Sequence, residues 1–444
     1  TPTTANSNRS DKLLVSFFAR GNYNYRDRYL FTATVRADGS TVFSKNHKWG
    51  YFPSFSAAWR ISEENFMKKQ DVVSNLKLRA GWGVVGNDRI TNYLSLELYS
   101  QGKYGYGNNV ITVLSPKQLQ NEDIKWEASQ STNVGIDLGL FRNRLNITAD
   151  FFLKDTKDLL MAANRAYVSG FASQWKNVGK IRNKGIEIAI NSTNIASKSG
   201  FRWTTDFNIS FIRNELRALA GGAKEMQTSA SWNGDYTGYD YTARVGQSLG
   251  LIYGYVFDGV YQTSDFNVNA ATGEYMLKEG VTDISDHAGV PVKPGMVKYK
   301  DTDGDGVITT DDKTIIGDAY PDFTGGFSTS LSWNGLDFSA SFAYSYGGEV
   351  INFQDYYLYN MEGSGNQYSI VADRYISDAQ PGRNNVPIAS RISTTNTSLK
   401  LSSYYVEDAS FFRCANITLG YTLPKRWTSK LHITSCRVYV SGDN

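Results

Sequence analysis

Residues 327–346 read F-S-T-S-L-S-W-N-G-L-D-F-S-A-S-F-A-Y-S-Y. Apolar and polar side chains alternate along two segments joined by Asn334-Gly335, a dipeptide that strongly favours a tight hairpin. The apolar positions share one face, whereas serines and Asp337 line the other face, which is too polar to pack as a core. The same period returns at 145–151 and 201–211. Strands of about ten residues with one apolar and one polar face are typical of a closed β-barrel that spans a membrane.

Twelve segments carry this alternation and are predicted to be antiparallel barrel strands, at the length expected for tilted transmembrane β-segments. Their ranges are 13–24, 29–37, 49–60, 76–85, 126–140, 145–156, 182–193, 201–213, 323–333, 335–346, 409–423 and 435–442. No linker or charge block divides them, so we expect residues 1–444 to form one β unit. Helix signals are sparse, and Ser62 could cap a short helix over 63–70.

The connections between these strands alternate in length. The tight ones are 25–28, 142–144, 196–200 and 334–335. The long ones are 86–125, 157–181, 214–322 and 347–408. Bacterial outer-membrane barrels have short periplasmic turns and long extracellular loops, whereas a soluble sandwich has no reason to separate its long loops in this way. The four long segments are therefore predicted to be extracellular.

The composition agrees with a barrel and argues against several other classes of protein. Aromatic residues make up 14% of the 444 residues, with 29 Tyr and 9 Trp, which suits aromatic girdles at two membrane interfaces. A net charge of +3 without a basic patch argues against nucleic-acid binding. No apolar run reaches the roughly 18 residues of a spanning helix, and residues 1–9 have no features of an export signal.

The two ends of the chain suggest part of a larger barrel. The strand at 437–444 stops in the middle of its pattern, and nothing before Leu13 could fill a lumen. Cys414 and Cys436 fall in the last two predicted strands, where they are either cross-strand neighbours or two isolated thiols, because sequence cannot fix the geometry of a disulfide.

One motif points to a metal. Residues 301–312, D-T-D-G-D-G-V-I-T-T-D-D, have the spacing of a calcium loop, with a Gly at the sixth position for the sharp turn. The predicted oxygen ligands are Asp301, Asp303, Asp305, the backbone carbonyl of Val307, Thr309 and Asp312. Asp312 replaces the bidentate Glu of an EF-hand and flanking helices are not evident, so we expect a structural calcium site in an extracellular segment, 298–322. An acidic Asx turn without an ion is the alternative.

Catalysis has little support in the sequence. His47, His287 and His432 lie far apart, and no metal-binding histidine spacing, nucleophile elbow or Cys/His pairing accompanies them. We therefore expect a protein that is not an enzyme.

Aromatic side chains gather in the predicted outer loops. Flat rings beside Asn, Asp and Gln suit a sugar or peptide ligand, although packing of one loop on another explains single residues equally well. The candidate ligand-binding residues are Trp175, Trp232, Tyr236, Tyr239, Tyr241, Tyr356, Tyr357 and Tyr359, and Tyr104 and Tyr106 form a further pair.

Several long segments closely resemble one family. R-Y-L-F-T-A-T-V-R-A-D-G-S-T-V-F (28–43), W-G-Y-F-P-S-F-S-A-A-W-R-I-S (49–62) and the segments 76–87, 177–188, 301–326 and 416–424 are similar to SusC/RagA-like TonB-dependent outer-membrane transporters. The resemblance covers nearly the whole chain and keeps the order of the motifs.

The resemblance implies a 22-stranded barrel in the bacterial outer-membrane lipid, filled by an N-terminal plug that this sequence lacks. It implies a SusD-like lipoprotein as a lid, and a TonB complex that acts through the missing plug region. About twelve strands here, one after residue 444 and about nine before residue 1 would complete the count.

The expected function is TonB-dependent import of oligosaccharides, with a peptide importer of the same family as the alternative. A soluble or surface-attached β-rich glycan-binding module and a structural barrel without transport are further alternatives. In a barrel, the polar face would line a wet lumen. The charged side chains predicted to point into it are Arg36, Asp38, Asp150, Arg202, Asp206 and Asp337.

Overall fold

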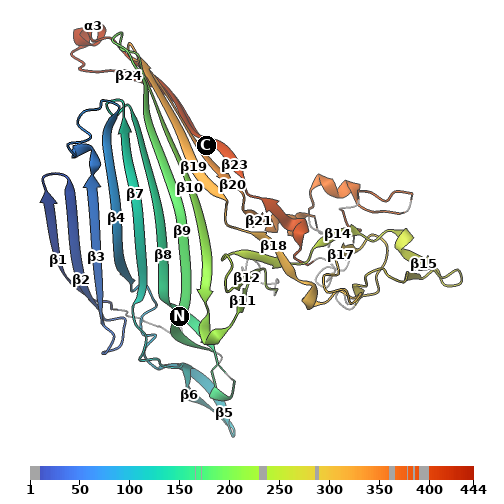
Figure 1. The fold of residues 1–444 in the computed structure, drawn as a ribbon. Helices are drawn as coiled ribbons and strands as arrows, with labels where there is room; N and C mark the ends of the chain where they lie inside the picture. Colours follow the sequence, from blue (N-terminus) through green and yellow to red (C-terminus); the bar gives the residue numbers. More distant parts are fainter. Residues whose placement is uncertain are drawn as a thin grey trace.

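A twelve-stranded antiparallel sheet dominates the computed structural model, which describes residues 11–165, 167–171, 173–229, 238–285, 290–359, 366–377, 379–383, 386–389 and 400–444 (Figure 1). The strands lie side by side in the order in which the sequence produces them. They are β1 (Leu14–Tyr25), β2 (Tyr29–Ser40), β3 (Trp49–Arg60), β4 (Val73–Asn87), β7 (Glu127–Leu140), β8 (Leu145–Asn164), β9 (Ser173–Ala196), β10 (Arg202–Ala218), β19 (Phe323–Trp333), β20 (Leu336–Tyr346), β23 (Phe411–Thr422) and β24 (Arg437–Asp443). All twelve predicted strands are confirmed.

The hairpin between β19 and β20 has the predicted geometry. Asn334 (φ 47°) and Gly335 (φ 85°) both have positive φ, and Trp333 pairs with Leu336 directly beside them. Two successive left-handed residues match the right-handed twist of the flanking strands. The turn therefore fixes the register that places Phe327 opposite Phe342 and Ser328 opposite Ser341.

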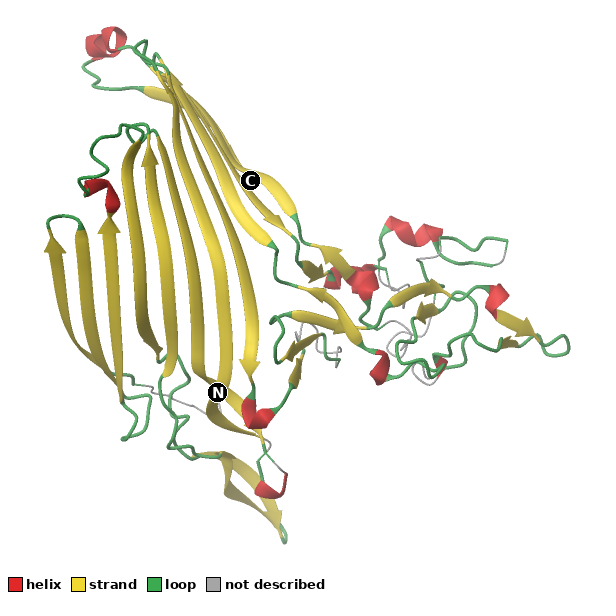
Figure 2. Ribbon diagram, viewed as in Figure 1, coloured by secondary structure: helices red, strands yellow, loops and turns green. Residues whose placement is uncertain are grey.

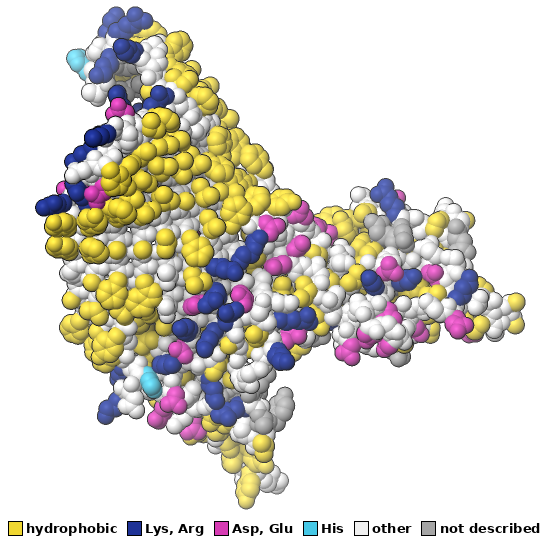
Figure 3. Space-filling model, in the orientation of Figure 1, with side chains coloured by type: hydrophobic (Ala, Val, Ile, Leu, Met, Phe, Trp, Pro, Cys, Tyr) yellow, Lys and Arg dark blue, Asp and Glu magenta, His cyan; other side chains and the backbone are white. Residues whose placement is uncertain are grey.

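The register aligns apolar side chains across the sheet. One unbroken row is Phe31, Ala57, Ala80, Val134, Phe151, Ile186 and Phe211, each opposite the next. Phe31 is 50% exposed and Phe151 is 48% exposed, so no second sheet covers this row among the described residues. Figure 3 shows hydrophobic side chains spread over the strands, with charged side chains gathered towards the loops and turns. The sheet is a lipid-facing wall and not one half of a soluble sandwich.

Aromatic rings mark both ends of the apolar face. Tyr29 stacks on Trp59 at the end with tight turns, with ring centroids 6.3 Å apart, and Phe17 stacks on Trp49 at the opposite end, 6.1 Å apart. Trp49 and Trp59 are ten residues apart on the same face of β3. At about 3.3 Å per residue this is roughly 33 Å along a tilted strand, which matches an apolar band with aromatic girdles.

Two expectations from the sequence need correction, and one open alternative is decided. The segment 157–181 is mostly not a loop, because β8 and β9 extend to Asn164 and from Ser173 as a long hairpin. The helix expected over 63–70 is only a 3₁₀ turn, η1 (Ile61–Glu63), and no side chain caps it. Of the two alternatives for the cysteines, isolated thiols are the one found: Cys414 and Cys436 are free, and the carbonyl of Cys436 accepts from the amide of Leu423 while Asn416 pairs with Asp443.

The connections opposite the tight turns carry small elements of their own (Figure 2). The strands are β5 (Leu98–Tyr106), β6 (Asn109–Gln118), β11 (Glu225–Thr228), β12 (Tyr241–Arg244), β13 (Leu251–Gly254), β14 (Phe257–Val260), β15 (Phe266–Val268), β16 (Tyr275–Leu277), β17 (Val297–Tyr299), β18 (Thr314–Asp318), β21 (Glu349–Ile351) and β22 (Val406–Asp408). The α-helix α2 (Phe353–Leu358) also belongs to these connections, whereas α3 (Lys425–Thr428) lies between β23 and β24, at the end of the sheet with the tight turns (Figure 1). The 3₁₀ turns of these connections are η2 (Tyr167–Ser169), η3 (Ala220–Gly222), η4 (Thr263–Asp265), η5 (Thr310–Asp312), η6 (Ser369–Asp373) and η7 (Ser403–Tyr405), and η8 (Ser429–Leu431) follows α3. Among the described residues, neither α-helix has the length or apolarity to cross a bilayer.

The described parts of the long connections 219–322 and 347–410 pack together into what we call the loop unit. One of its clusters holds Tyr255, Tyr261, Tyr299 and Ile308, all at most 1% exposed, and a second holds Ile252, Leu401 and Tyr405. Tyr255 donates its amide to the carbonyl of Leu401, which ties the two connections together. The loop unit therefore has a core of its own beside the sheet (Figure 1).

Candidate functional site

The polar face of the sheet carries a network of charges. Register places all six predicted lumen residues on this face. Arg79 Nε donates to Asp137 Oδ2 (2.9 Å) and Arg79 Nη2 to Asp150 Oδ2 (3.1 Å), which links β4, β7 and β8. Further contacts on this face are Arg36 with Asp38 (2.7 Å), Asn191 with Asp206 (2.6 Å) and Arg437 with Asp337 (2.9 Å from Nε). Paired charges suit a wet wall that contacts water or another polar surface.

A hollow of about 610 Å³ opens towards the loop end of this polar face, on β2, β3, β4 and β7. Its polar lining includes Arg36, Asp38, Ser54, Asp88 and Asn133. The sequence shows that such residues alternate along the strands, but only the register brings them from four strands to one place.

Two aromatic rings close the loop end of this hollow. Phe52 and Trp126 meet edge to face with centroids 5.3 Å apart, and Trp126 Nε1 donates to the carbonyl of Lys48 (2.9 Å). Glycine at position 86 is required here, because a Cβ would lie 2.1 Å from the Phe52 ring. Both rings are buried, so they fix the shape of the hollow and do not present a free face to a ligand.

The structure separates the predicted ligand-binding aromatics into different environments. Tyr239 is 52% exposed, whereas Tyr241 and Tyr356 are half-buried against the second cluster of the loop unit. Tyr356 contacts Tyr405, with centroids 5.4 Å apart, and Tyr359 contacts Tyr368 (5.3 Å) and Tyr404 (6.3 Å). The ring contacts of Tyr356 and Tyr359 therefore lie within the connection 347–410, and Tyr241 packs from 219–322 against a cluster to which both connections contribute.

The remaining aromatic candidates do not join that group. Trp175 lies in β9 and packs against the cluster that holds Phe52 and Trp126. Trp232 and Tyr236 lie outside the described residues, and so does the side chain of Tyr357, whose backbone belongs to α2.

The predicted calcium loop brings three of its carboxylates together. Asp301, Asp303 and Asp305 each offer an oxygen within 4.8 Å of the others. The amides of Gly304 (2.6 Å) and Gly306 (2.8 Å) donate to Asp301, and these two hydrogen bonds hold its pKa below the ordinary value. At Asp303 the amide of Asp305 lowers the pKa, but desolvation and the neighbouring carboxylates outweigh it and raise the pKa overall. Hard cations such as calcium prefer oxygen donors of this kind, so the three carboxylates are candidate metal ligands.

Asp312 has a different role in this geometry. It is fully buried, and its two carboxylate oxygens accept from the amides of Thr302 and Thr309, both at 2.8 Å. Thr309 Oγ1 in turn accepts from the amide of Asp311. The twelfth and ninth positions therefore close the loop through hydrogen bonds and lie outside the group of three carboxylates.

Two features of the long connections were not predicted from the sequence. The β5–β6 hairpin projects alone from the loop end, with Tyr104 and Tyr106 exposed near its tip (Figure 1). Its signal was present, because Gly107-Asn108 separates two alternating segments.

The second missed feature is a carboxyl pair, Asp355 on α2 and Glu407 on β22. Asp355 is 8% exposed, and burial together with the Glu407 carboxylate raises the pKa of Asp355 to about 6. Asn352 Nδ2 donates to Glu407 (2.8 Å), a hydrogen bond that links the start of α2 to β22 within the connection 347–410. Nothing in the sequence indicates that these residues meet.

Comparison with known proteins agrees with the geometry. Residues 1–444 match the family described as "TonB dependent receptor-like, beta-barrel". TonB-dependent receptor P3 of Formosa agariphila is 36% identical over 431 residues, which are 97% of this chain and 40% of that protein. TonB-dependent receptor SusC of Bacteroides thetaiotaomicron is 31% identical over 447 residues, again 97% and 40%.

A solved structure of the RagAB peptide transporter matches 98% of this chain and 44% of its own, with a TM-score of 0.75 and 26% identity. The chain thus spans about two fifths of the length of the curated relatives. These matches cover the sheet and the loop unit alike. The chain therefore belongs to the SusC/RagA-like TonB-dependent receptors, and its sheet is β-barrel wall of the bacterial outer membrane.

Proposed function

We propose that this chain forms the wall and extracellular mouth of a TonB-dependent importer of oligosaccharides. The observation that carries the proposal is a sheet with one lipid-facing and one charged face, matched over its whole length to receptors of this family. In the complete transporter, a SusD-like lipoprotein would act as a lid over the loop unit. TonB would act through a plug domain outside these residues, and the nutrient would pass without any bond being made or broken.

The expected substrate class can be tested by uptake. A strain that lacks the complete gene should fail to grow on one oligosaccharide as its only carbon source, and the wild-type gene should restore growth. A variant without the TonB-contacting segment should bind the sugar at the cell surface but not import it. Normal growth of the deletion strain on every oligosaccharide tested would contradict the proposal.

Peptide import is the second candidate, because the matched RagAB structure is named as a peptide transporter. The paired charges around the lumen hollow, Arg36 with Asp38 and Lys12 with Asp88, could contact peptide termini as well as sugar hydroxyls. Labelled peptides and labelled oligosaccharides offered to the same cells separate the two, since only the true substrate should accumulate in a TonB-dependent way.

We further propose that the loop 301–312 binds one calcium ion through Asp301, Asp303, Asp305 and the carbonyl of Val307. The three carboxylates converge, and a bound cation would neutralise their mutual repulsion. The ion would stiffen the segment 298–322, which joins the loop unit to β19 through β18. Its role would be structural.

Calcium titration of the purified transporter should give one site that Asp303→Asn weakens at least tenfold. Chelator should increase proteolysis within 298–322 in the wild type. A matched control is Asp258→Asn, an exposed acidic residue of the loop unit outside the three carboxylates. Identical protease sensitivity with and without chelator would contradict calcium binding.

A further inference from the structure

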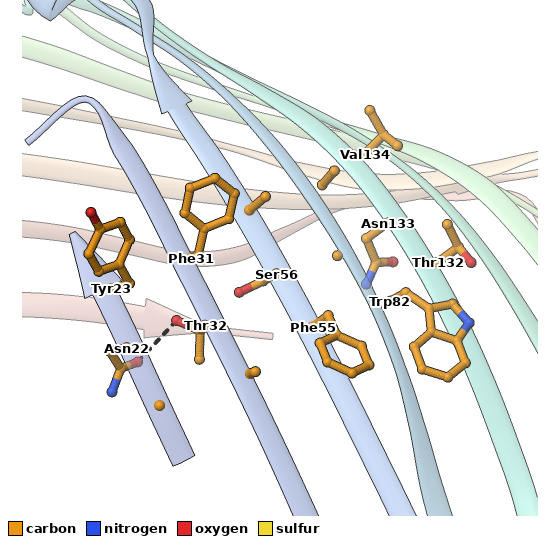
Figure 4. Close-up of a pocket in the computed structure, with 15 residues that line it drawn as sticks. Asn22, Tyr23, Phe31, Thr32, Phe55, Ser56, Trp82, Thr132, Asn133 and Val134 are labelled. Atoms are coloured by element: carbon orange, nitrogen blue, oxygen red, sulfur yellow. Dashed lines mark hydrogen bonds between the residues drawn. The ribbon is translucent and has the colours of Figure 1, made fainter. Parts of the chain in front are cut away.

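An apolar hollow of about 630 Å³ opens on the lipid-facing side of β1, β2, β3, β4 and β7 (Figure 4). It arises where small residues interrupt two neighbouring rows of large ones. In one row Ala57 and Ala80 lie between Phe31 and Val134. In the next row, Gly21 and Ala33 precede Phe55, Trp82 and Thr132.

The walls of this hollow are fixed by packing across strands. Phe55 and Trp82 stack with centroids 6.0 Å apart, and Tyr23 lies opposite Phe31 on the other side of the small residues. Figure 4 shows Tyr23, Phe31, Phe55 and Trp82 around the hollow. Its outward-facing lining is almost entirely apolar, which suits a hydrocarbon chain and offers little to a polar ligand.

The position of the hollow along the strands places it in one leaflet of the membrane. Ala57 is two residues from Trp59 and eight from Trp49, the aromatic residues at the two ends of β3. At about 3.3 Å per residue, Ala57 lies roughly 7 Å along the strand from the turn-side girdle and roughly 26 Å from the loop-side girdle. Tight turns are periplasmic in outer-membrane barrels, so the hollow lies in the periplasmic half of the apolar band.

The guanidinium of Arg26 lies at the depth of the lipid headgroups of the same leaflet. Arg26 is exposed on the turn after β1, its guanidinium lies 5.1 Å from the Tyr25 ring centroid, and it forms no ion pair within the described residues. Arg28 is paired with Glu64 (3.1 Å), and Asp27 is hydrogen-bonded to Asn24 (2.6 Å). Arg26 follows Tyr23 by three residues, which places it roughly 10 Å along the chain from the hollow.

We propose that this hollow binds one acyl chain of a glycerophospholipid of the periplasmic leaflet, with the lipid phosphate held by Arg26. The apolar space takes the tail and the unpaired guanidinium takes the phosphate, as basic side chains beside membrane-embedded grooves do. Lipid A of the outer leaflet would have its phosphates at the Trp49 end of the sheet, far from both the hollow and Arg26. This site is independent of the nutrient path, because it lies on the opposite face of the sheet.

The test uses the full-length transporter in mild detergent, titrated with phosphatidylglycerol and separately with lipid A, with bound lipids counted by native mass spectrometry. Wild-type protein should bind one phosphatidylglycerol at least tenfold more tightly than Ala57→Leu/Ala80→Leu, which fills the hollow, and severalfold more tightly than Arg26→Gln. Ala149→Leu, which faces lipid on β8 outside the hollow, is the matched control and should bind as the wild type does. Quenching of Trp82 by brominated acyl chains should fall in the same order.

Arg26→Gln alters only an exposed turn, so it keeps the proposal testable if the double variant fails to fold. Equal phosphatidylglycerol binding by all four proteins, or tighter binding of lipid A, would overturn the proposal. A dimer that Ala57→Leu/Ala80→Leu dissociates would also overturn it, because the hollow would then belong to a second copy of the chain. Nutrient uptake by Arg26→Gln should stay normal, so failure of this site and failure of the import function are distinguishable.

Discussion

The barrel sheet and the loop unit bury their apolar side chains against different partners. Phe31 and Phe151 of the sheet are about half exposed in the protein alone, so their burial is left to lipid. Tyr261 and Tyr299 of the loop unit are fully buried by other side chains of the same unit. The sheet turns its apolar face towards lipid and its polar face towards the lumen. The loop unit instead buries its apolar side chains in its centre and exposes its polar surface to water.

This difference determines which substitutions each region should tolerate. Every second residue of a strand meets hydrocarbon, so the sheet depends on period and register more than on close packing. The loop unit is water-exposed and must be stabilised by its own packed core. Damage to one region should therefore leave the other intact.

The largest expected effect is in the core of the loop unit. Tyr261→Ala removes a buried ring and the hydrogen bond from its hydroxyl to the carbonyl of Thr282 (2.6 Å), and should destabilise the loop unit by about 3–5 kcal/mol. Hydrogen exchange should accelerate in β14–β17 and stay unchanged in β1–β10. Tyr275→Ala, at an exposed ring of the same unit, is the control. Faster exchange in the sheet would show that the two regions are one cooperative unit.

The next effect tests the lipid face. Ile188→Arg places a cation on the apolar face of β9 near the middle of the band and should cost about 2–4 kcal/mol. Ala189→Arg, one residue along on the wet face, should cost less than about 1 kcal/mol, since its side chain reaches water. Denaturant unfolding of the complete barrel in lipid vesicles measures both. Equal costs would contradict the assignment of the two faces.

A smaller effect concerns the charges of the wet face. Arg79→Met leaves Asp150 without its cation and Asp137 with only Lys77, at 3.6 Å, and should cost on the order of 1–2 kcal/mol in the same unfolding assay. The control is Arg202→Met, whose arginine forms no ion pair within the described residues. If Arg79→Met left the free energy of unfolding unchanged, water would be solvating Asp137 and Asp150 fully.

The smallest effect is a pH dependence confined to the loop unit. The pKa of Asp355 is raised to about 6 by burial and by Glu407, so the folded state holds a proton that the unfolded chain releases near pH 4. The raised pKa of Asp355 therefore adds most to the free energy of unfolding of the loop unit below about pH 4. This contribution is lost as the pH rises from about 4 to 6. The tyrosines Tyr359 and Tyr404 nearby stay neutral throughout this range.

The protection factors of the α2 amides, which are their exchange rates corrected for the intrinsic rate at each pH, should accordingly be larger at pH 5 than at pH 7.5. Asp355→Asn should remove this difference, while Asp258→Asn, an exposed carboxylate of the same unit, should leave it unchanged. A difference that persists in Asp355→Asn would assign the titration to another group.

Sequence predicted the sheet well because its information is local. Alternation at 145–151 and the Asn334-Gly335 turn define strand, face and register within a few residues. Strands were not predicted where the alternation of apolar and polar residues weakened. Beyond Thr156, two bulges shift the pairing of β8 with β9, so alternation in the sequence does not predict that β8 continues to Asn164.

The candidate site was predicted in part for the same reason. Asp301, Asp303 and Asp305 converge because five residues of one turn contain them, and sequence spacing suffices for that. Asp312 was predicted as a ligand, but folding directs its carboxylate to the amides of Thr302 and Thr309. The aromatic candidates Tyr241 and Tyr356 are 115 residues apart in sequence and meet one cluster only through the packing of two long connections.

By itself the sequence determined a barrel wall with two unlike faces, because a side-chain period of two is imposed by strand geometry and survives without tertiary contacts. The tertiary structure alone decided which residues of different strands and loops share a hollow or a carboxyl pair. The lipid-face hollow at Ala57 and Ala80, the lumen hollow at Arg36 and the pair of Asp355 with Glu407 all depend on register or on loop packing. Such contacts join residues distant in the chain, and no local pattern records them.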